Sequence, residues 1–332
     1  MSDVQQLKPK DFKSDQEVRW CPGCGDYSII NSVQATLAAC GVPKENVVMV
    51  SGIGCSSRFP YYMDTYGLHG IHGRANAIAT GVKVANPELD VWVITGDGDG
   101  LSIGGNHMIH SLRRNVNLKI ILFNNEIYGL TKGQYSPTTP QGQKTKTSPF
   151  GSVDHPFNPV QLALGAGSSF VARTMDASPK HMKSILKAAA DHKGSAFVEV
   201  WQNCVIFNDG AFKAWSDKKV RDEQTILLED GQPMIFGAEK DKGLKAEGCQ
   251  IKVVPAAEAS VWNASNDCAG PAFVMSQLDN NPEMPRPFGV LHQVQMPTLE
   301  GLIHDQIKEV TDQKGPGNIR DLIYTPDAWT VE

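Results

Sequence analysis

Short apolar runs separated by amphipathic segments recur along residues 27–201. Four runs consist almost entirely of apolar residues and are rich in Val and Ile: 47–51, 91–95, 118–125 and 196–201. Strands without polar alternation are typical of a sheet that is buried on both faces. The segment SSFVART, residues 168–174, predicts one further strand of the same kind.

The segments between these strands carry apolar residues at helical spacing. Helices are predicted over 27–40, 72–85, 104–115 and 178–192, and another begins at Asn158-Pro159. Asp26 and Ser178 are expected to cap the first and last of them, and Gly41 ends the first. The alternation of strands and helices predicts an α/β fold, doubly wound around a mostly parallel sheet.

The regular alternation fades after about residue 205. The sequence there is rich in Gly, Pro, Asn and Asp, with one clear late helix near 297–310. We therefore divide the chain into an N-terminal arm (1–18), a main domain (19–210) and an irregular C-terminal extension (211–332). The polar, turn-rich segment 131–156 is either a functional loop or partly mobile.

Composition excludes several classes of protein. The 332 residues are 41% hydrophobic and carry a net charge of -5, which argues against a nucleic-acid binder. No run of 18 apolar residues predicts a membrane span, and the polar start of the chain carries no signal core, so a cytoplasmic location is expected. Seven cysteines are too few and of the wrong parity for a disulfide-stapled scaffold, so metal binding or catalysis is favoured.

Four chemically useful side chains follow the ends of predicted strands. They are Cys55, Asp97, Asn125 and Cys204. Ligands of open α/β sheets bind outside the carboxyl ends of the strands. These sequence-distant groups are therefore expected to share one edge of the sheet.

The stretch GDGDG, residues 96–100, offers backbone N–H groups for a phosphate and carboxylates for a hard cation. Asp97, the side-chain oxygen of Asn125 and a carbonyl of the following turn would form half of the oxygen shell that Mg²⁺ prefers, and a diphosphate would complete it. The alternative is that GDG is only a strand-to-helix turn. The Asn pair at the end of the next strand, with 26 residues between Gly98 and Asn125, makes that alternative the weaker one.

The motif CPGC places Cys21 and Cys24 on either side of a Pro-Gly turn. A pair with this spacing can be a redox disulfide, half of a zinc site or part of an iron–sulfur cluster. The redox pair leaves Cys55 and Cys204 unexplained, whereas zinc could use the same four thiolates.

The motifs CPGC, GIGCSSR, HGRA, GDGDG and NNEIYG, followed by a late cysteine, occur in the order seen in the β subunits of 2-oxoacid:ferredoxin oxidoreductases, which residues 19–210 resemble. The resemblance implies a thiamine diphosphate-binding fold with one 4Fe-4S cluster held by Cys21, Cys24, Cys55 and Cys204. It implies magnesium bound by Asp97, Asn125 and the carbonyl of Ile127. The residues that it implies for thiamine diphosphate are Ile53, Gly54, Ser56, His72, Gly98, Gly129 and Leu130.

The implied reaction is oxidative decarboxylation of a 2-oxoacid with coenzyme A, giving an acyl-CoA, CO₂ and electrons for ferredoxin. WCPGCGDYSI looks more like the 2-oxoglutarate branch than the pyruvate branch, and Arg58 is the candidate in this chain for a second substrate carboxylate, unless it forms a structural ion pair. No catalytic residue that activates the cofactor is identified here. An α subunit is expected to supply it, in a dimer of αβ heterodimers.

Three other functions remain compatible with parts of the sequence. The same chemistry could act on pyruvate or on a broad range of 2-oxoacids. A non-oxidative thiamine diphosphate decarboxylase or an acetolactate synthase would share GDG and NN but has no use for four clustered cysteines. A metal-stapled binding subunit would keep the cysteines but has no use for Asp97 and Asn125.

Overall fold

The computed structural model describes residues 7–331, and residues 1–6 of the predicted N-terminal arm lie outside it. Its centre is an eight-stranded sheet in the order β2-β1-β3-β4-β6-β5-β11-β7, beside which β8, β9 and β10 form a small antiparallel sheet. The strands are β1 (Val47–Ser51), β2 (Tyr66–His69), β3 (Asp90–Gly96), β4 (Lys119–Asn124), β5 (Phe170–Met175), β6 (Ala196–Trp201), β7 (Thr225–Leu228), β8 (Ile235–Phe236), β9 (Lys242–Glu247), β10 (Gln250–Pro255) and β11 (Arg286–Gln293).

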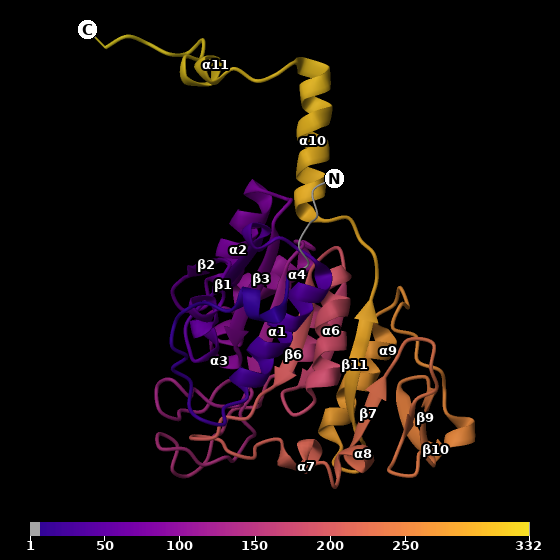
Figure 1. Cartoon of the computed structure of the whole chain (residues 1–332). Helices are drawn as coiled ribbons and strands as arrows, with labels where there is room; N and C mark the ends of the chain where they lie inside the picture. Colours follow the sequence, from indigo (N-terminus) through magenta and orange to yellow (C-terminus); the bar gives the residue numbers. More distant parts are fainter. Residues whose placement is uncertain (1–6, 332) are drawn as a thin grey trace.

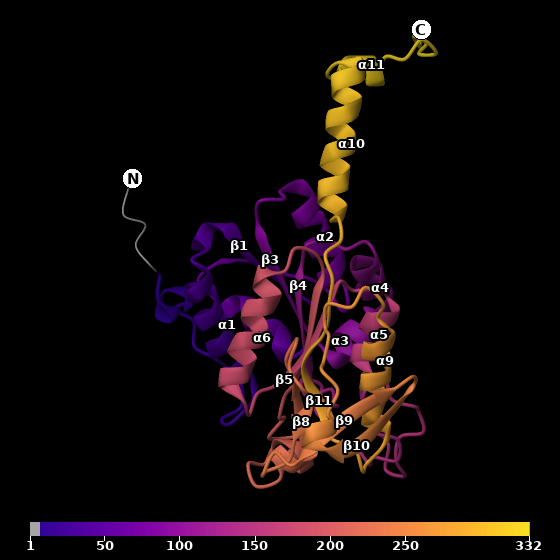
Figure 2. The same ribbon diagram turned by 90° about the vertical axis from the view of Figure 1, so that its right-hand side faces the viewer.

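Helices cover both faces of the main sheet. Figure 2 shows α1 and α6 on one side of it and α4, α5 and α9 on the other. The helices are α1 (Asp26–Cys40), α2 (Ala75–Ala85), α3 (Asp97–Leu101), α4 (Gly105–Arg113), α5 (Pro159–Gly165), α6 (Pro179–Asp191), α7 (Lys213–Ser216), α8 (Arg221–Gln224), α9 (Gly270–Ser276), α10 (Leu299–Lys314) and α11 (Ile319–Ile323). The doubly wound, mostly parallel α/β fold is therefore confirmed. None of the helices described is both long and apolar enough to cross a membrane.

Two hydrophobic cores explain why the strands lack polar alternation. In β1, Val48 and Val50 pack with α2 and α4, whereas Val47 and Met49 pack with α1 and α6. Successive side chains of a strand point to opposite faces, so a strand covered on both sides needs apolar residues at every position. All five residues of β1 are buried.

Two local predictions, and the turn considered for GDGDG, need correction. GDGDG is not a turn, because β3 passes directly into the short helix α3 at Asp97. Asp26 is the first residue of α1 rather than its cap, and Gly25 occupies the cap position. Ser178 does stand at the cap position of α6, but its hydroxyl makes no cap bond there and instead accepts a hydrogen bond from Arg221.

The chain after residue 205 adds two strands to the main sheet. β11 pairs antiparallel with β5 on one side and parallel with β7 on the other. Because β11 ends beside the first residue of β5, the chain leaves the sheet at the amino ends of the parallel strands. The predicted late helix is confirmed as α10, which projects from the body in Figure 1.

Candidate cofactor site

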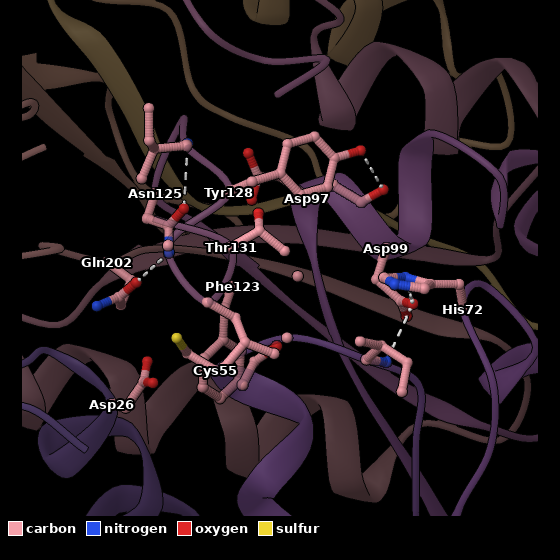
Figure 3. A pocket seen from close by; sticks show the side chains of 18 residues that line it. Asp26, Cys55, His72, Asp97, Asp99, Phe123, Asn125, Tyr128, Thr131 and Gln202 are labelled. Carbon is pink, nitrogen blue, oxygen red and sulfur yellow. Dashed lines mark hydrogen bonds and ion pairs between the residues drawn. The ribbon is translucent and has the colours of Figure 1, made fainter. Parts of the chain in front are cut away.

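The segments that follow β1, β3 and β4 converge on one pocket at the carboxyl edge of the sheet (Figure 3). This pocket is called here the acidic pocket, after its aspartates Asp97 and Asp99. The structure brings together in its lining all ten residues that the sequence assigned to magnesium and thiamine diphosphate: Ile53, Gly54, Ser56, His72, Asp97, Gly98, Asn125, Ile127, Gly129 and Leu130.

The carboxylate of Asp97 is held by two hydroxyl groups of a distant loop. Ser136 Oγ donates to Asp97 Oδ2, and Thr138 Oγ1 lies 2.7 Å from the same oxygen. Asp97 is only 2% exposed, and burial raises its pKa to about 6 against the lowering effect of these hydrogen bonds. The loop 131–156 therefore reaches the site and orients its central carboxylate.

Asp99, two residues later, ties two other loops to the pocket. Its Oδ1 accepts hydrogen bonds from the backbone N–H groups of Ile53 (3.1 Å) and Gly73 (2.7 Å). Its Oδ2 accepts one from Thr95 Oγ1 at 2.8 Å. His72 Nδ1 stands 3.5 Å from Oδ1, so Asp99 also lies beside the one histidine predicted to contact the cofactor.

A tight turn after β4 presents Asn125 and Ile127 to the pocket. Asn125 Oδ1 accepts the Ile127 N–H at 3.2 Å, and its amide nitrogen donates to Gln202 Oε1 at 2.8 Å. Glu126, between them, has a φ of 57°, a left-handed conformation that is uncommon outside glycine. Burial, with the nearby charges of Asp97 and Glu199, raises the pKa of Glu126 to about 8.

Gly98 is required by the packing of the pocket. A Cβ atom at this position would stand 2.2 Å from Cε1 of Tyr128. The hydroxyl of Tyr128 donates to the carbonyl of Gly98 at 3.1 Å, so ring and backbone are in direct contact (Figure 3).

The donor set fits magnesium and a diphosphate. Asp97 offers a carboxylate, Asn125 an amide oxygen and Ile127 a carbonyl, all of them the hard oxygen ligands that Mg²⁺ takes. Glycines at positions 54, 98 and 129 leave backbone exposed in the lining, where N–H groups can approach phosphate oxygens.

A second pocket, called here the cysteine pocket, adjoins the first. The sulfur-bearing residues Cys21, Cys24, Cys55 and Cys204 all line it. It shares six lining residues with the acidic pocket: Asp26, Cys55, Asn125, Gly129, Leu130 and Gln202. A Cβ built at Gly129 would lie 3.5 Å from Cys204 Sγ and 3.7 Å from Cys55 Sγ, so this residue, which lines both pockets, packs beside two of the four thiols.

The four thiols line the same pocket, but they are not drawn together as the ligands of one metal centre are. All are free, and burial raises the pKa of Cys55 to about 12 and that of Cys24 further still. Within residues 7–331, no three His, Cys, Asp or Glu side chains stand close enough to hold a metal ion. The donor set matches the cysteine-only ligation of a 4Fe-4S cluster, so thiolates bound to iron would replace costly buried anions by metal bonds.

The other candidate residues lie apart from both pockets or at their margin. Cys40 is half-buried at the end of α1, and Cys249 and Cys268 are exposed. Lys144 and Lys146 are also exposed and line neither pocket. Arg58 does line the cysteine pocket, where its Nε donates to Tyr62 Oη at 2.9 Å.

Several residues of the site carry no signal in the sequence. Ser136 and Thr138 sit in a loop whose path no periodicity encodes, and Gln202 lies just beyond β6. Asp99 is part of GDGDG, and that repeat of Asp at a two-residue spacing is the one signal that could have identified it. Asp26 is 1% exposed and lines both pockets, and its Oδ2 has no hydrogen-bond partner among the residues that the structure describes.

Comparison with known proteins identifies the family. Residues 33–200 match the thiamine pyrophosphate enzyme, C-terminal TPP binding domain. The chain is 48% identical to 2-oxoglutarate oxidoreductase subunit KorB of Mycobacterium tuberculosis, over 99% of this chain and 90% of that protein. It is 46% identical to 2-oxoglutarate synthase subunit KorB of Archaeoglobus fulgidus, over 70% of this chain and 87% of that protein.

A solved structure supports the same assignment. The 2-oxoglutarate:ferredoxin oxidoreductase of Magnetococcus marinus, with 2-oxoglutarate, coenzyme A and succinyl-CoA bound, superimposes with a TM-score of 0.78 at 33% identity and covers 97% of each chain. The fold of the sheet is thus that of a thiamine diphosphate-binding domain. The chain belongs to the β subunits of the 2-oxoacid:ferredoxin oxidoreductases.

Proposed function

We propose that this chain is the β subunit of a 2-oxoglutarate:ferredoxin oxidoreductase that forms succinyl-CoA and CO₂ and passes the electrons through one 4Fe-4S cluster to ferredoxin. The observation that carries the proposal is the contact between the two pockets. The acidic pocket gathers every residue assigned to magnesium and thiamine diphosphate, and the cysteine pocket gathers every proposed cluster ligand. Cys55 lines both pockets, so a proposed ligand of the cluster would also border the bound cofactor, and the electrons would have only a short distance to travel.

The residues of the acidic pocket bind and orient the cofactor. Asp97, Asn125 and the carbonyl of Ile127 would hold magnesium, which neutralises diphosphate charge. Asp99 keeps the loops at Ile53 and Gly73 closed around the pocket through its backbone hydrogen bonds. When bound, thiamine diphosphate supplies the carbanion stabilisation that decarboxylation of a 2-oxoacid requires.

The residues of the cysteine pocket would hold the cluster and shield it. Cys21 and Cys24 come from the turn before α1, Cys55 follows β1 and Cys204 follows β6, so one centre would tie three parts of the fold together. Trp20 Nε1 donates to the carbonyl of Cys55 at 2.8 Å and thereby fixes the backbone at one proposed ligand. A 4Fe-4S cluster supplies one-electron transfer at low potential when bound.

An α subunit is the partner that the family implies. We propose that it carries the acid that faces the aminopyrimidine ring and that two αβ units associate. The pyrimidine and diphosphate halves of the cofactor are bound by different domains in such enzymes, and one domain of the diphosphate kind occupies this chain. The chain alone should therefore bind the cofactor incompletely and turn over no oxoacid.

The second carboxylate of 2-oxoglutarate needs a cation. Arg58 lines the cysteine pocket, is half-buried, and forms no ion pair with a carboxylate within residues 7–331. The structural ion pair considered as the alternative for it is not formed, which leaves its guanidinium available to an anion.

Steady-state kinetics of the reconstituted αβ complex test the substrate. The specificity constant for 2-oxoglutarate, measured by oxoacid- and CoA-dependent reduction of a viologen dye, is expected to exceed that for pyruvate by at least about tenfold, because the half-buried cation of Arg58 favours a dianion. Equal or better use of pyruvate would refute the choice of substrate while leaving the family intact. A rate of dye reduction that does not depend on CoA would refute the proposed reaction.

A further inference from the structure

A buried ion pair lies beneath the acidic pocket. Arg173 of β5 and Glu199 of β6 face each other across neighbouring strands, and each side chain is 1% exposed. Arg173 Nε donates to Glu199 Oε2 at 2.7 Å. On its far side, Arg173 makes two hydrogen bonds to Asp279, of 2.9 and 2.7 Å. Arg173, Asn124 and Trp201 all direct N–H groups at Glu199, so the oxygens of this side chain act as hydrogen-bond acceptors.

Glu199 in turn fixes the side-chain amide of Asn124. Glu199 Oε1 accepts hydrogen bonds from Asn124 Nδ2 at 2.7 Å and from Trp201 Nε1 at 3.1 Å. A flipped amide would set the Asn124 oxygen against a carboxylate in a dry interior, which is strongly unfavourable. Glu199 therefore forces Asn124 Oδ1 to point away from the ion pair and toward the pocket.

The oxygen of Asn124 contacts groups next to all three proposed magnesium ligands. It accepts the backbone N–H of Glu126 at 3.3 Å, and that strained residue lies between Asn125 and Ile127. It also lies 2.9 Å from Thr138 Oγ1, the hydroxyl that contacts Asp97. One amide oxygen thus touches the turn that carries two proposed ligands and the group that holds the third.

We propose that Glu199 is a positioning residue for the magnesium–diphosphate site, acting through the orientation of the Asn124 amide. The inference rests on the proposed function, since it concerns the same cofactor. Asp279 anchors Arg173 from the C-terminal part of the chain, on the side of the guanidinium away from Glu199. Arg173 and Glu199 would thus have a function at the site in addition to holding β5 to β6.

The variant Glu199→Gln tests the proposal because glutamine keeps the shape of glutamate but replaces one acceptor oxygen by an NH₂ donor. Arg173, Trp201 and Asn124 all present N–H groups, so a glutamine must turn its own NH₂ toward one of these donors. If the side-chain amide of Asn124 flipped to relieve this clash between donors, its oxygen would move away from the N–H of Glu126. Calorimetric titration of the anaerobically purified αβ complex with Mg²⁺ in the presence of thiamine diphosphate should show affinity roughly tenfold or more below wild type.

Two further variants separate positioning from stability. Asn124→Ala keeps the Arg173–Glu199 pair and removes the oxygen, so it should lose Mg²⁺ affinity to a similar extent, and it carries the test if Glu199→Gln does not fold. Asp279→Asn weakens the same buried network beyond Arg173 and should lower the melting temperature while leaving the affinity within about twofold of wild type.

Wild-type affinity in Asn124→Ala or in folded Glu199→Gln would overturn the proposal. So would a loss of affinity in Asp279→Asn as large as in Glu199→Gln, because that result would tie affinity to stability alone. Iron content should be the same in all the variants. A wild-type complex that binds neither Mg²⁺ nor thiamine diphosphate would instead overturn the proposed function, and this inference with it.

Discussion

Asp97 and Asp99 stand two residues apart in one short helix, yet their carboxylates have different partners. The carboxylate oxygens of Asp99 accept hydrogen bonds from Ile53, Gly73 and Thr95, so this side chain holds three parts of the chain together. Asp97 receives hydroxyl groups on Oδ2 and lines the pocket beside Asn125. The distinction comes from α3, which sends the two side chains to different neighbours.

Replacing Asp97 with Ala should abolish binding of thiamine diphosphate with magnesium. The loss would remove the one carboxylate from the proposed shell, so apparent Mg²⁺ affinity should fall by more than about 100-fold. Calorimetry on the αβ complex measures this, with iron content as the control for an intact cysteine pocket. Undiminished affinity would remove Asp97 from the site.

His192 makes stability depend on pH. It is 2% exposed, its Nε2 lies 2.7 Å from Ser169 Oγ, and burial together with the charges of Lys119 and His292 lowers its pKa to about 4. The unfolded chain binds a proton near pH 6.5 and the folded chain does not. Its contribution to stability is therefore complete above pH 6.5 and is lost as pH falls toward 4.

Urea unfolding of the complex between pH 7 and 4 measures this loss. His192→Gln removes the titrating group and should flatten the pH dependence over that window, by up to about 1.4 kcal/mol per unit of pKa difference. Identical slopes for the variant and wild type would show that other groups account for the acid sensitivity.

At the scale of elements, the sequence predicted the parts that follow simple periodicities. The buried strands β1, β3, β4 and β6 were recognisable because both of their faces are apolar. The polar groups just beyond them could be placed together, since parallel strands end at one edge of the sheet.

The remaining parts of the structure depend on tertiary contacts that leave little trace in the sequence. β2 is exposed at every position, and β7 has only four residues, so neither stands out as a strand. Ser136 and Thr138 reach the site from an irregular segment whose course depends on packing. GDGDG begins a short helix although glycine favours turns, and Gly98 is needed there to admit Tyr128.

Gly98→Ala tests that packing. The added Cβ overlaps the ring of Tyr128 and should cost about 1–3 kcal/mol of stability and weaken cofactor binding. Gly81→Ala in the exposed part of α2 is the matched control, since a Cβ there meets nothing within 4 Å and should stabilise by about 0.5–1 kcal/mol. Thermal unfolding of both variants measures this difference, and equal melting temperatures would contradict the close contact between Gly98 and Tyr128.

At the scale of the whole molecule, α10 and the residues after it form an arm with few contacts to the body. The base is fixed, since Thr298 caps α10 and the amide of Asn115 donates to the carbonyls of Met296 and Pro297. Beyond the base the side chains are exposed, and several are large and apolar: Leu302, Ile307, Val310, Ile319, Leu322, Ile323, Tyr324, Trp329 and Val331.

Deleting residues 302–332 should therefore leave the chain folded. We expect the free energy of unfolding of the isolated chain to change by less than about 0.5 kcal/mol, as for other exposed positions. Deletion from residue 286 onward removes β11 from the sheet and should prevent folding. A large fall in melting temperature on deletion of 302–332 would contradict the exposure of the arm.

The central claim is that Cys21, Cys24, Cys55 and Cys204 hold one iron–sulfur cluster beside a thiamine diphosphate pocket. Iron analysis and the visible spectrum of the anaerobically purified αβ complex test it most directly, comparing Cys55→Ser and Cys204→Ser with Cys40→Ser as the matched control. We predict about four iron atoms bound through this chain and broad visible absorbance in the wild type and Cys40→Ser, and loss of both from the other two variants. A colourless, zinc-bearing wild type, or equal iron in all four proteins, would contradict the account.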